Sequence, residues 1–100
     1  MKICKEMEKL REYLTQKKIE WRDDSDVYDE FEYISPILDM SIYRTKFNHD
    51  GYLWSIIHGM GTYGEEKGLL ELMTNRVNGG EPLGYLTADD VIALIEKYCF

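Results

Sequence analysis

Residues 40–58 read MSIYRTKFNHDGYLWSIIH. β-branched and aromatic side chains lie on both sides of Asp50-Gly51, and this dipeptide is a strong hairpin signal because glycine tolerates the positive φ of a primed turn. We therefore predict two strands, over 40–47 and 52–58. A two-residue loop fixes the register, whereas a four-residue loop would shift it. With the two-residue loop, the pairs on the core face are Phe47 with Trp54, Thr45 with Ile56, and Tyr43 with His58.

An amphipathic helix is predicted N-terminal to the hairpin, over residues 2–18. Its apolar positions recur at spacings of three and four residues, as in a helix that packs one face on a core. These positions are Ile3, Met7, Leu10 and Leu14. Apolar and polar residues alternate around Ile19 and Trp21, which predicts a short strand near 19–22.

Two further helices are predicted C-terminal to the hairpin. Residues 65–77 carry apolar side chains at helical spacing, and Asn78-Gly79-Gly80 follows as a typical helix stop. Residues 88–98 follow Thr87, whose hydroxyl can cap a helix, with Asp90 at the third helical position. The element order predicts one α+β domain, residues 1–100, with three helices packed on one face of a small, mostly antiparallel sheet.

The acidic charge of the chain is concentrated in one segment. The 100 residues carry a net charge of -7, and residues 20–39 alone carry eight acidic side chains and one basic side chain. Aromatic residues are interspersed there, which is unusual for a loop that only contacts water. The segment is interpreted either as a solvated loop held to the core by its aromatic residues, or as an acidic surface that binds a basic protein. A carboxylate metal site is a third interpretation, although the glycine and terminal glutamate of an EF-hand loop are missing.

The second interpretation defines a partner-binding surface. Its carboxylates would speed association with a basic host protein, and its aromatic side chains would be buried as anchors. The net charge disfavours direct binding to nucleic acid or to an anionic membrane, while a homo-oligomer is left open. The surface consists of Glu20, Trp21, Asp23, Asp24, Asp26, Tyr28, Asp29, Glu30 and Phe31.

A glycine-rich run follows the hairpin. Gly59, Gly61 and Gly64 match the spacing G-x-G-x-x-G, and backbone N–H groups in such a loop can hold a phosphate. A hairpin is not the parallel unit of a dinucleotide site, and Glu65 and Glu66 would repel an anion. The run is interpreted first as a structural turn. The alternative is a small-ligand or nucleotide-sequestering site formed by His58, Gly59, Gly61, Thr62, Tyr63, Gly64 and Arg76.

No motif predicts catalysis or metal binding. His58 has no nucleophile in a recognised arrangement, so a hydrogen-bonded histidine at a strand end is favoured. Two cysteines and two histidines without CxxC or HxxxH spacing do not form a zinc site. Because no signal-peptide pattern is present, Cys4 and Cys99 are expected to be free thiols in a reducing cytoplasm, with a Cys4–Cys99 disulfide as the alternative. We expect a non-enzymatic protein without a cofactor.

Three runs of sequence carry a resemblance to a known group: HGMGTYG at 58–64, GLLELM at 68–73 and GEPLGYLTADDVI at 80–92. In these runs, and over about residues 7–98, the chain resembles small proteins encoded by phages and prophages of gut Firmicutes. No activity is established for that group, so the resemblance assigns no catalytic residue. It implies a phage accessory protein in the cytoplasm of a host bacterium, and such proteins often act in counter-defence by binding. The expected function is therefore an anti-CRISPR-like inhibitor or adaptor.

Overall fold

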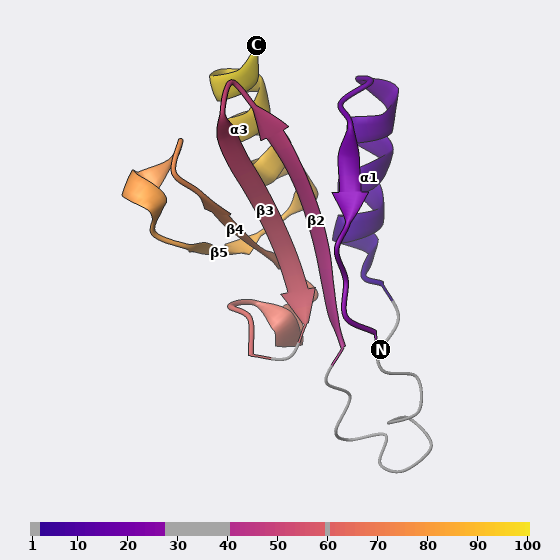
Figure 1. The fold of residues 1–100 in the computed structure, drawn as a ribbon. Helices are drawn as coiled ribbons and strands as arrows, with labels where there is room; N and C mark the ends of the chain where they lie inside the picture. Colours follow the sequence, from indigo (N-terminus) through magenta and orange to yellow (C-terminus); the bar gives the residue numbers. More distant parts are fainter. Residues whose placement is uncertain (1–2, 28–40, 60) are drawn as a thin grey trace.

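Five antiparallel strands form one sheet in a computed structural model, which describes residues 3–27, 41–59 and 61–100 (Figure 1). The strand order in the sheet follows the order in the chain. The strands are β1 (Trp21–Asp23), β2 (Ile42–His49), β3 (Tyr52–Gly59), β4 (Leu70–Thr74) and β5 (Leu83–Leu86). Two helices, α1 (Lys5–Gln16) and α3 (Ala88–Cys99), pack against each other on one face of the sheet. The α+β class and the antiparallel sheet are confirmed.

The predicted hairpin is present with the predicted register. β2 and β3 pair Phe47 with Trp54 and place the other two expected pairs opposite each other. Asp50 and Gly51 have φ of +50° and +82°, as a two-residue primed turn requires. The Phe47 and Trp54 rings stack with centroids 5.6 Å apart, and both side chains are buried. The face of the hairpin that contacts the helices is therefore the one expected from the sequence.

The helix predicted over 65–77 is wrong. Glu65–Lys67 is a single 3-10 turn, Gly68 ends it at φ +68°, and β4 begins two residues later. The apolar residues that fit a helical spacing also fit the alternating pattern of a strand. Leu70, Leu72 and Thr74 lie on the core face of β4, which pairs with β3, and all three are buried. The edge of β3 that faces away from β2 has backbone N–H and C=O groups that need hydrogen-bond partners. This requirement outweighs the local helical pattern. The structure has two helices, not three, among the described residues.

The other two helices are confirmed with small changes at their ends. Of the helix predicted over 2–18, residues Lys5–Gln16 are helical, and residue 2 lies outside the described ranges. Thr87 caps α3: its Oγ1 accepts a hydrogen bond from the Asp90 N–H at 3.1 Å, and Asp90 Oδ2 accepts from the Thr87 N–H at 2.9 Å. This reciprocal pair satisfies two N–H groups that a helix leaves unpaired at its start.

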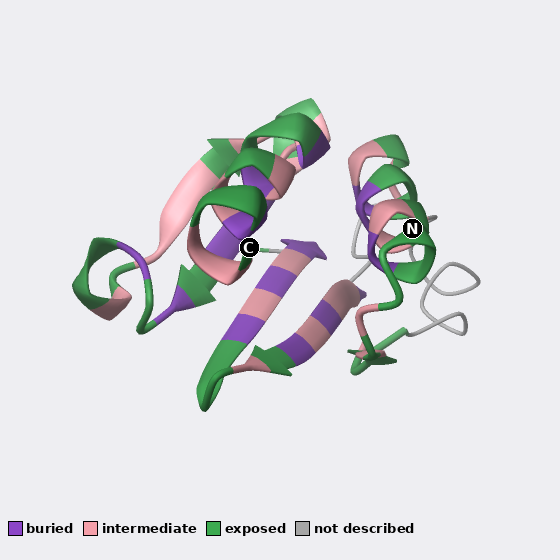
Figure 2. Ribbon diagram, turned by 90° about the horizontal axis from the view of Figure 1, so that it is seen from above, coloured by how far each residue is buried: buried purple, intermediate pink, exposed green. Residues whose placement is uncertain are grey.

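The core lies between the two helices and the sheet. Figure 2 shows buried and half-buried positions alternating along the hairpin strands, as expected where one face of a sheet contacts helices. No helix in the described ranges is long and apolar enough to cross a membrane. The buried apolar side chains are Met7, Leu10, Leu14, Phe47, Trp54, Ile56, Leu70, Leu72, Val77, Ala88, Val91 and Ile95.

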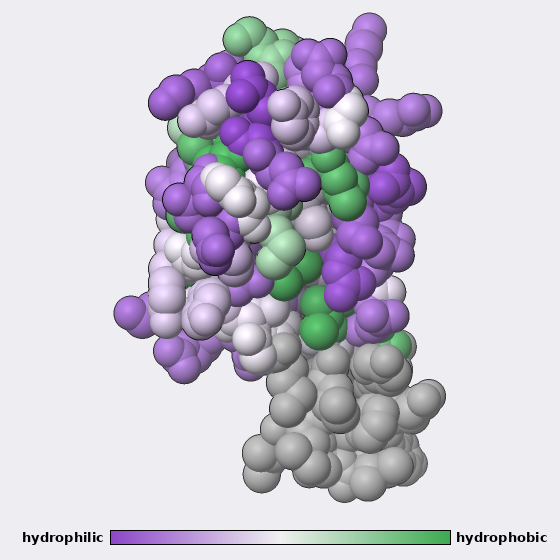
Figure 3. All heavy atoms as spheres, turned by 60° about the vertical axis from the view of Figure 1, so that its left-hand side comes forward, coloured by the Kyte–Doolittle hydropathy of each residue, from purple (hydrophilic) through white to green (hydrophobic). Residues whose placement is uncertain are grey.

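The opposite face of the sheet carries no helix in the described part of the chain. Leu53 and Met73 expose 44% and 47% of their surface there, and Arg44 and Lys46 lie on the same face of β2. In the view of Figure 3, hydrophobic atoms occur in small groups among hydrophilic ones. This face is therefore a mixed surface and not a second apolar core.

Candidate functional site

Five of the nine predicted partner-binding residues lie in the described part of the chain, on and beside β1. Trp21 is half-buried, and the four carboxylates are exposed. These carboxylates are Glu20, Asp23, Asp24 and Asp26. Outside the described residues lie Tyr28, Asp29, Glu30 and Phe31. The structure therefore describes only the first part of the acidic segment, where it joins the sheet at β1.

Arg11 of α1 holds β1 against the helix. Its side chain is only 13% exposed, and its guanidinium carbon lies 5.0 Å from the centroid of the Trp21 ring. Its Nη2 and Nη1 donate to the two oxygens of Asp23 at 3.1 and 3.3 Å. The same guanidinium donates from Nε to Thr45 Oγ1 at 2.7 Å and from Nη2 to the Arg44 carbonyl at 3.2 Å. The planar fork of one arginine thus connects α1, β1 and β2.

Two basic side chains of β2 pair with the next carboxylates. Lys46 Nζ lies 2.8 Å from Asp24 Oδ2, and Arg44 Nη1 lies 3.8 Å from the same oxygen. Arg44 Nη1 also lies 3.6 Å from Asp26 Oδ2. The two aspartates expose 54% and 59% of their side chains, so these pairs are accessible to solvent and each stabilises the fold only slightly.

These contacts favour the ionised form of the carboxylates. A hydrogen bond from Ser25 is the largest cause that lowers the pKa of Asp23, burial opposes it, and Arg11 adds to the lowering. The pKa of Asp24 is lowered mainly by its hydrogen bond and ion pair with Lys46. Both carboxylates are therefore charged at neutral pH and held in place by basic or hydroxyl groups.

Three of the four described carboxylates are paired with basic side chains of α1 and β2. Asp23 pairs with Arg11, and Asp24 and Asp26 pair with Arg44 and Lys46. Arg22 of β1 adds a smaller effect on Asp24. Residues 28–40 contain four acidic residues and no basic one, namely Asp29, Glu30, Glu32 and Asp39. Sequence reasoning treated 20–39 as one acidic unit because the compensating bases are distant in the chain and only the fold brings them to β1.

The sheet holds Asp26 and Ile42, the residues that flank 27–41, side by side. The Asp26 N–H donates to the Ile42 carbonyl at 2.8 Å, and the Ile42 N–H donates to the Asp26 carbonyl at 2.8 Å. Two residues earlier, the Asp24 N–H donates to the Arg44 carbonyl at 3.0 Å. The chain therefore leaves the sheet after Asp26 and returns to it at Ile42, immediately beside the point where it left.

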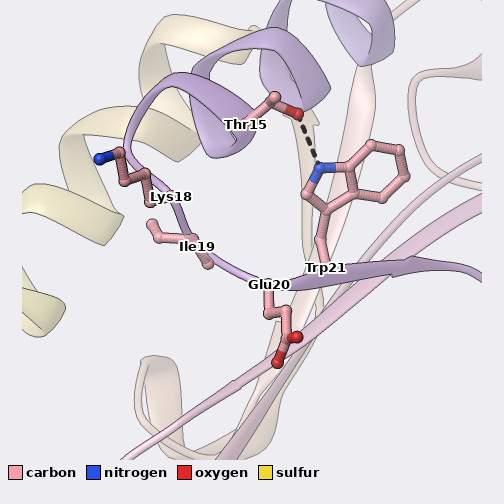
Figure 4. A pocket seen from close by; sticks show the side chains of 5 residues that line it. All are labelled: Thr15, Lys18, Ile19, Glu20 and Trp21. Carbon is pink, nitrogen blue, oxygen red and sulfur yellow. Dashed lines mark hydrogen bonds between the residues drawn. The ribbon is translucent and has the colours of Figure 1, made fainter.

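A shallow groove lies next to Trp21 at the same end of β1. It has a volume of about 320 Å³ and is formed by the turn between α1 and β1. The Trp21 Nε1–H donates to Thr15 Oγ1 at 3.0 Å, which fixes the indole against the helix (Figure 4). Figure 4 shows Glu20 and Lys18 pointing away from this hydrogen-bonded pair. The groove is open and bordered by an acid and a base, so it favours no single ligand charge.

Three backbone N–H groups in the described part of the glycine-rich run already have side-chain acceptors. The Gly61 N–H donates to Glu65 Oε2 at 3.0 Å, and the Tyr63 N–H donates to Glu71 Oε1 at 3.1 Å. The Gly59 N–H donates to the Thr62 hydroxyl at 3.1 Å. Carboxylates of the protein thus occupy positions that a phosphate would need.

The structure does not gather the remaining predicted ligand-binding residues around that loop. Arg76 lies over two tyrosine rings, with its guanidinium carbon 5.5 Å from Tyr52 and 5.0 Å from Tyr98. Tyr52 begins β3, whereas His58 lies at the far end of the same strand. His58 is 4% exposed and its Nδ1 lies 3.0 Å from the Leu69 carbonyl oxygen. The ring contacts of Arg76 are with Tyr52 and Tyr98 and not with the glycine-rich loop. The nucleotide site therefore stays a prediction.

An exposed tyrosine pair lies beside the same run. The rings of Tyr63 and Tyr85 stack at a centroid distance of 6.5 Å, and the two residues are 57% and 53% exposed. A Cβ on Gly84 would collide with the Cβ of Tyr63, so only glycine allows this close packing. With Glu65 and Glu66, the pair borders a hollow of about 270 Å³. This is a second acidic and aromatic surface, and of its residues the sequence analysis assigned only Tyr63 to a candidate site, the ligand loop.

Cys4 and His58 are two titratable groups near the start of α1 and the end of β3. Burial raises the pKa of the Cys4 thiol, but the influence of His58 prevails and leaves this pKa below its usual value. The pKa of His58 is raised in turn by Cys4. Within the described ranges, no group of three or more His, Cys, Asp and Glu side chains is arranged to hold a metal ion.

Comparisons with family models, with curated proteins and with solved structures find no match to this chain.

Proposed function

We propose that the protein is a non-enzymatic inhibitor or adaptor that binds a basic protein surface through the acidic segment 20–39. One observation carries the proposal. The Asp26–Ile42 backbone pair holds the chain at the sheet on both sides of residues 27–41, and Arg11, Arg44 and Lys46 pair with Asp23, Asp24 and Asp26. The proposal therefore assigns the attraction of a partner to residues 28–40, which carry four acids and no base in the sequence.

The chemistry of the segment indicates the kind of partner. Four carboxylates within 13 residues attract a basic surface over distances of about 8–10 Å at physiological salt, and they mainly accelerate association. Phe31 and Tyr33 lie between them in the sequence, Tyr28 directly precedes them, and these rings would supply apolar contact area. A protein surface that normally binds a nucleic-acid backbone has the matching charge. The resemblance to phage proteins supports the more specific proposal of a counter-defence inhibitor.

The experiment compares two variants with the same change of charge. Asp29→Asn, Glu30→Gln and Glu32→Gln together remove three of the four acidic charges of residues 28–40. The control variant, Glu8→Gln, Glu12→Gln and Glu81→Gln, removes three exposed carboxylates elsewhere. Each immobilised protein is exposed to a host bacterial lysate, and retained proteins are identified by mass spectrometry. The proposal predicts a basic protein retained by the wild type and by the control, and lost with the segment variant.

Two outcomes would contradict the proposal. One is equal retention of the same partner by all three proteins. The other is loss of the partner on Tyr85→Ala but not on neutralisation of the segment, which would assign binding to the tyrosine surface. Neutralising Asp23, Asp24 and Asp26 is a less selective test, because it leaves nearby basic side chains unpaired and changes the base of the segment as well as its charge.

A further inference from the structure

Tyr63 and Tyr85 form an aromatic pair that the packing of the core does not explain. Their rings stack with centroids 6.5 Å apart, and more than half of each residue is exposed to solvent. Aromatic side chains stabilise a fold mainly by the surface that they bury, and most of this surface stays in contact with water. The pair is therefore available for contact with a ligand.

The backbone is distorted where it brings the two rings together. β5 contains a bulge at this point, because Gly84 and Tyr85 both lie opposite the single residue Glu71 of β4. Tyr85 has φ of +60°, a left-handed conformation that a residue with a bulky side chain rarely adopts. Its N–H donates to the Tyr63 carbonyl at 3.4 Å. Bulges redirect side chains, and strained residues are concentrated at binding surfaces.

Close backbone contacts fix the loop of Tyr63 against β5. A Cβ on Gly64 would lie only 3.2 Å from the Tyr85 Cα, so this approach requires glycine. The Tyr63 N–H donates to Glu71 Oε1 at 3.1 Å, which also attaches the loop to β4. The two rings are consequently arranged before any ligand binds, and this preorganisation lowers the entropic cost of binding.

The hollow beside the pair has the electrostatic character of a cation site. It has a volume of about 270 Å³, and Glu65 and Glu66 line it together with the two tyrosines. The side chain of Glu66 is exposed and has no hydrogen bond or ion pair within the described ranges. Lys67 Nζ lies 5.8 Å from the centroid of the Tyr85 ring, so a cation of the protein itself already lies over this ring. Carboxylates and aromatic faces both attract positive charge.

A guanidinium group matches this surface in shape as well as in charge. It is planar, so it stacks on an aromatic ring, and its N–H fork can bond both oxygens of one carboxylate. The same chain shows this combination at β1, where the Arg11 guanidinium lies 5.0 Å from the Trp21 ring centroid and donates to both oxygens of Asp23. An ammonium group is a more strongly hydrated point charge and gains less from flat rings. The hollow therefore favours arginine over lysine.

We propose that the hollow between Tyr63, Tyr85 and Glu66 binds the guanidinium group of an arginine side chain on a partner protein. The group stacks on a tyrosine ring and pairs with the Glu66 carboxylate. The loop that carries the site follows directly after Gly59, which pairs with Ile42, so the site lies at the end of the hairpin where the chain returns from 27–41. The proposal assigns no role to residues 28–40 and does not depend on the proposed binding function.

The test uses the purified protein and two peptides that differ in one side chain. Acetyl-glycyl-arginyl-glycine amide and its lysine analogue are titrated into isotope-labelled protein at low salt, and amide shifts are followed by NMR. The arginine peptide should shift the signals of Tyr63, Tyr85 and Glu66 in a saturable way. The lysine peptide should bind about two- to fivefold more weakly, because it loses the stacked, bidentate contact.

Three variants separate the parts of the site. Tyr85→Leu removes the aromatic face but retains an apolar side chain, and Glu66→Gln removes the charge at an exposed position where the fold is not at risk. Each should weaken binding of the arginine peptide about two- to fivefold. Lys67→Met should strengthen it, because this change removes the cation that competes for the Tyr85 ring.

The controls distinguish this site from general attraction to an acidic protein. Glu81→Gln removes an exposed carboxylate outside the hollow and should bind the arginine peptide as the wild type does. The variant neutralised within residues 28–40 should also bind this peptide normally, even where it loses a partner from lysate. Equal affinity for the two peptides, or equal affinity of the Glu66→Gln and Glu81→Gln proteins for the arginine peptide, would overturn the proposal.

Discussion

Replacement of Arg11 by methionine tests the physical basis of the site. Methionine retains most of the apolar stem and removes the guanidinium. The change deletes the donor to Thr45 Oγ1, a hydroxyl on a fully buried residue, and the donors to Asp23 and to the Arg44 carbonyl. It also removes the cation from the Trp21 ring. α1 and β1 should therefore lose their main polar connection.

The magnitude follows from the burial of each contact. Hydrogen bonds from a charged group stabilise a fold by about 1.5–3 kcal/mol each where they are buried, which applies to the bond to Thr45. The bond to Asp23 contributes only about 0.5–1 kcal/mol, because this carboxylate is 54% exposed. Thr45 retains one partner, since its Oγ1 also donates to Met7 Sδ at 3.2 Å. We expect Arg11→Met to lower the free energy of unfolding by about 2–4 kcal/mol.

The assay is equilibrium unfolding in urea, followed by circular dichroism. Arg11→Lys should lie between wild type and Arg11→Met, because an ammonium retains the charge but cannot reproduce the planar fork. Lys9→Met is the matched control. Lys9 forms an ion pair with Asp89 in which both side chains are more than half exposed, and the expected loss is below about 0.5 kcal/mol. The reasoning would be refuted if Arg11→Met and Lys9→Met had equal effects, or if the lysine variant were as stable as wild type.

Three further predictions concern the fold. Gly59→Ala should lower the free energy of unfolding by about 2–3 kcal/mol, because the added Cβ would collide with the Ser41 carbonyl oxygen. The Cβ of Gly61→Ala would meet no atom, so this change should cost only about 1–2 kcal/mol for the positive φ of Gly61. Urea unfolding of both variants gives the order, and the reverse order would disprove the steric argument. Thr87→Ala should cost about 1 kcal/mol by loss of the α3 cap, measured as a lower Tm, and an unchanged Tm would show that the cap is dispensable. The pKa of Asp23 in the folded protein is lowered from 3.8, so the ionised carboxylate stabilises the fold above that pH, and this contribution is lost as the pH falls through the folded pKa. The difference in stability between wild type and Asp23→Asn should therefore shrink on acidification. A constant difference would contradict the assigned shift.

The central hairpin could be predicted from sequence because its signals are local. Asp50-Gly51 specifies a two-residue turn, and this turn fixes every pair along both strands. Thr87 and Asp90 similarly mark the start of α3 within four residues. β4 could not be recognised in this way, since the leucines of 69–72 fit both a helical and an extended pattern. The choice between them depends on the unpaired edge of β3, which is a property of the assembled sheet.

The candidate site could be predicted only in part for the same physical reason. The acidic residues of 20–39 are contiguous, so their excess charge is visible in the sequence. Their neutralisation is not visible, because Arg11 and Lys46 come from elements on either side of the segment. Long-range ion pairs follow from tertiary packing, which local patterns do not encode.

The salt dependence of association tests the central proposal most directly. The rate at which the retained partner binds is measured at increasing salt for the wild type, for the variant neutralised at Asp29, Glu30 and Glu32, and for the control neutralised at Glu8, Glu12 and Glu81. The account predicts a wild-type association rate that falls steeply with salt, by about tenfold or more, and a variant rate that is low and nearly independent of salt. The control should follow the wild type. Equal salt slopes for wild type and segment variant would contradict the account.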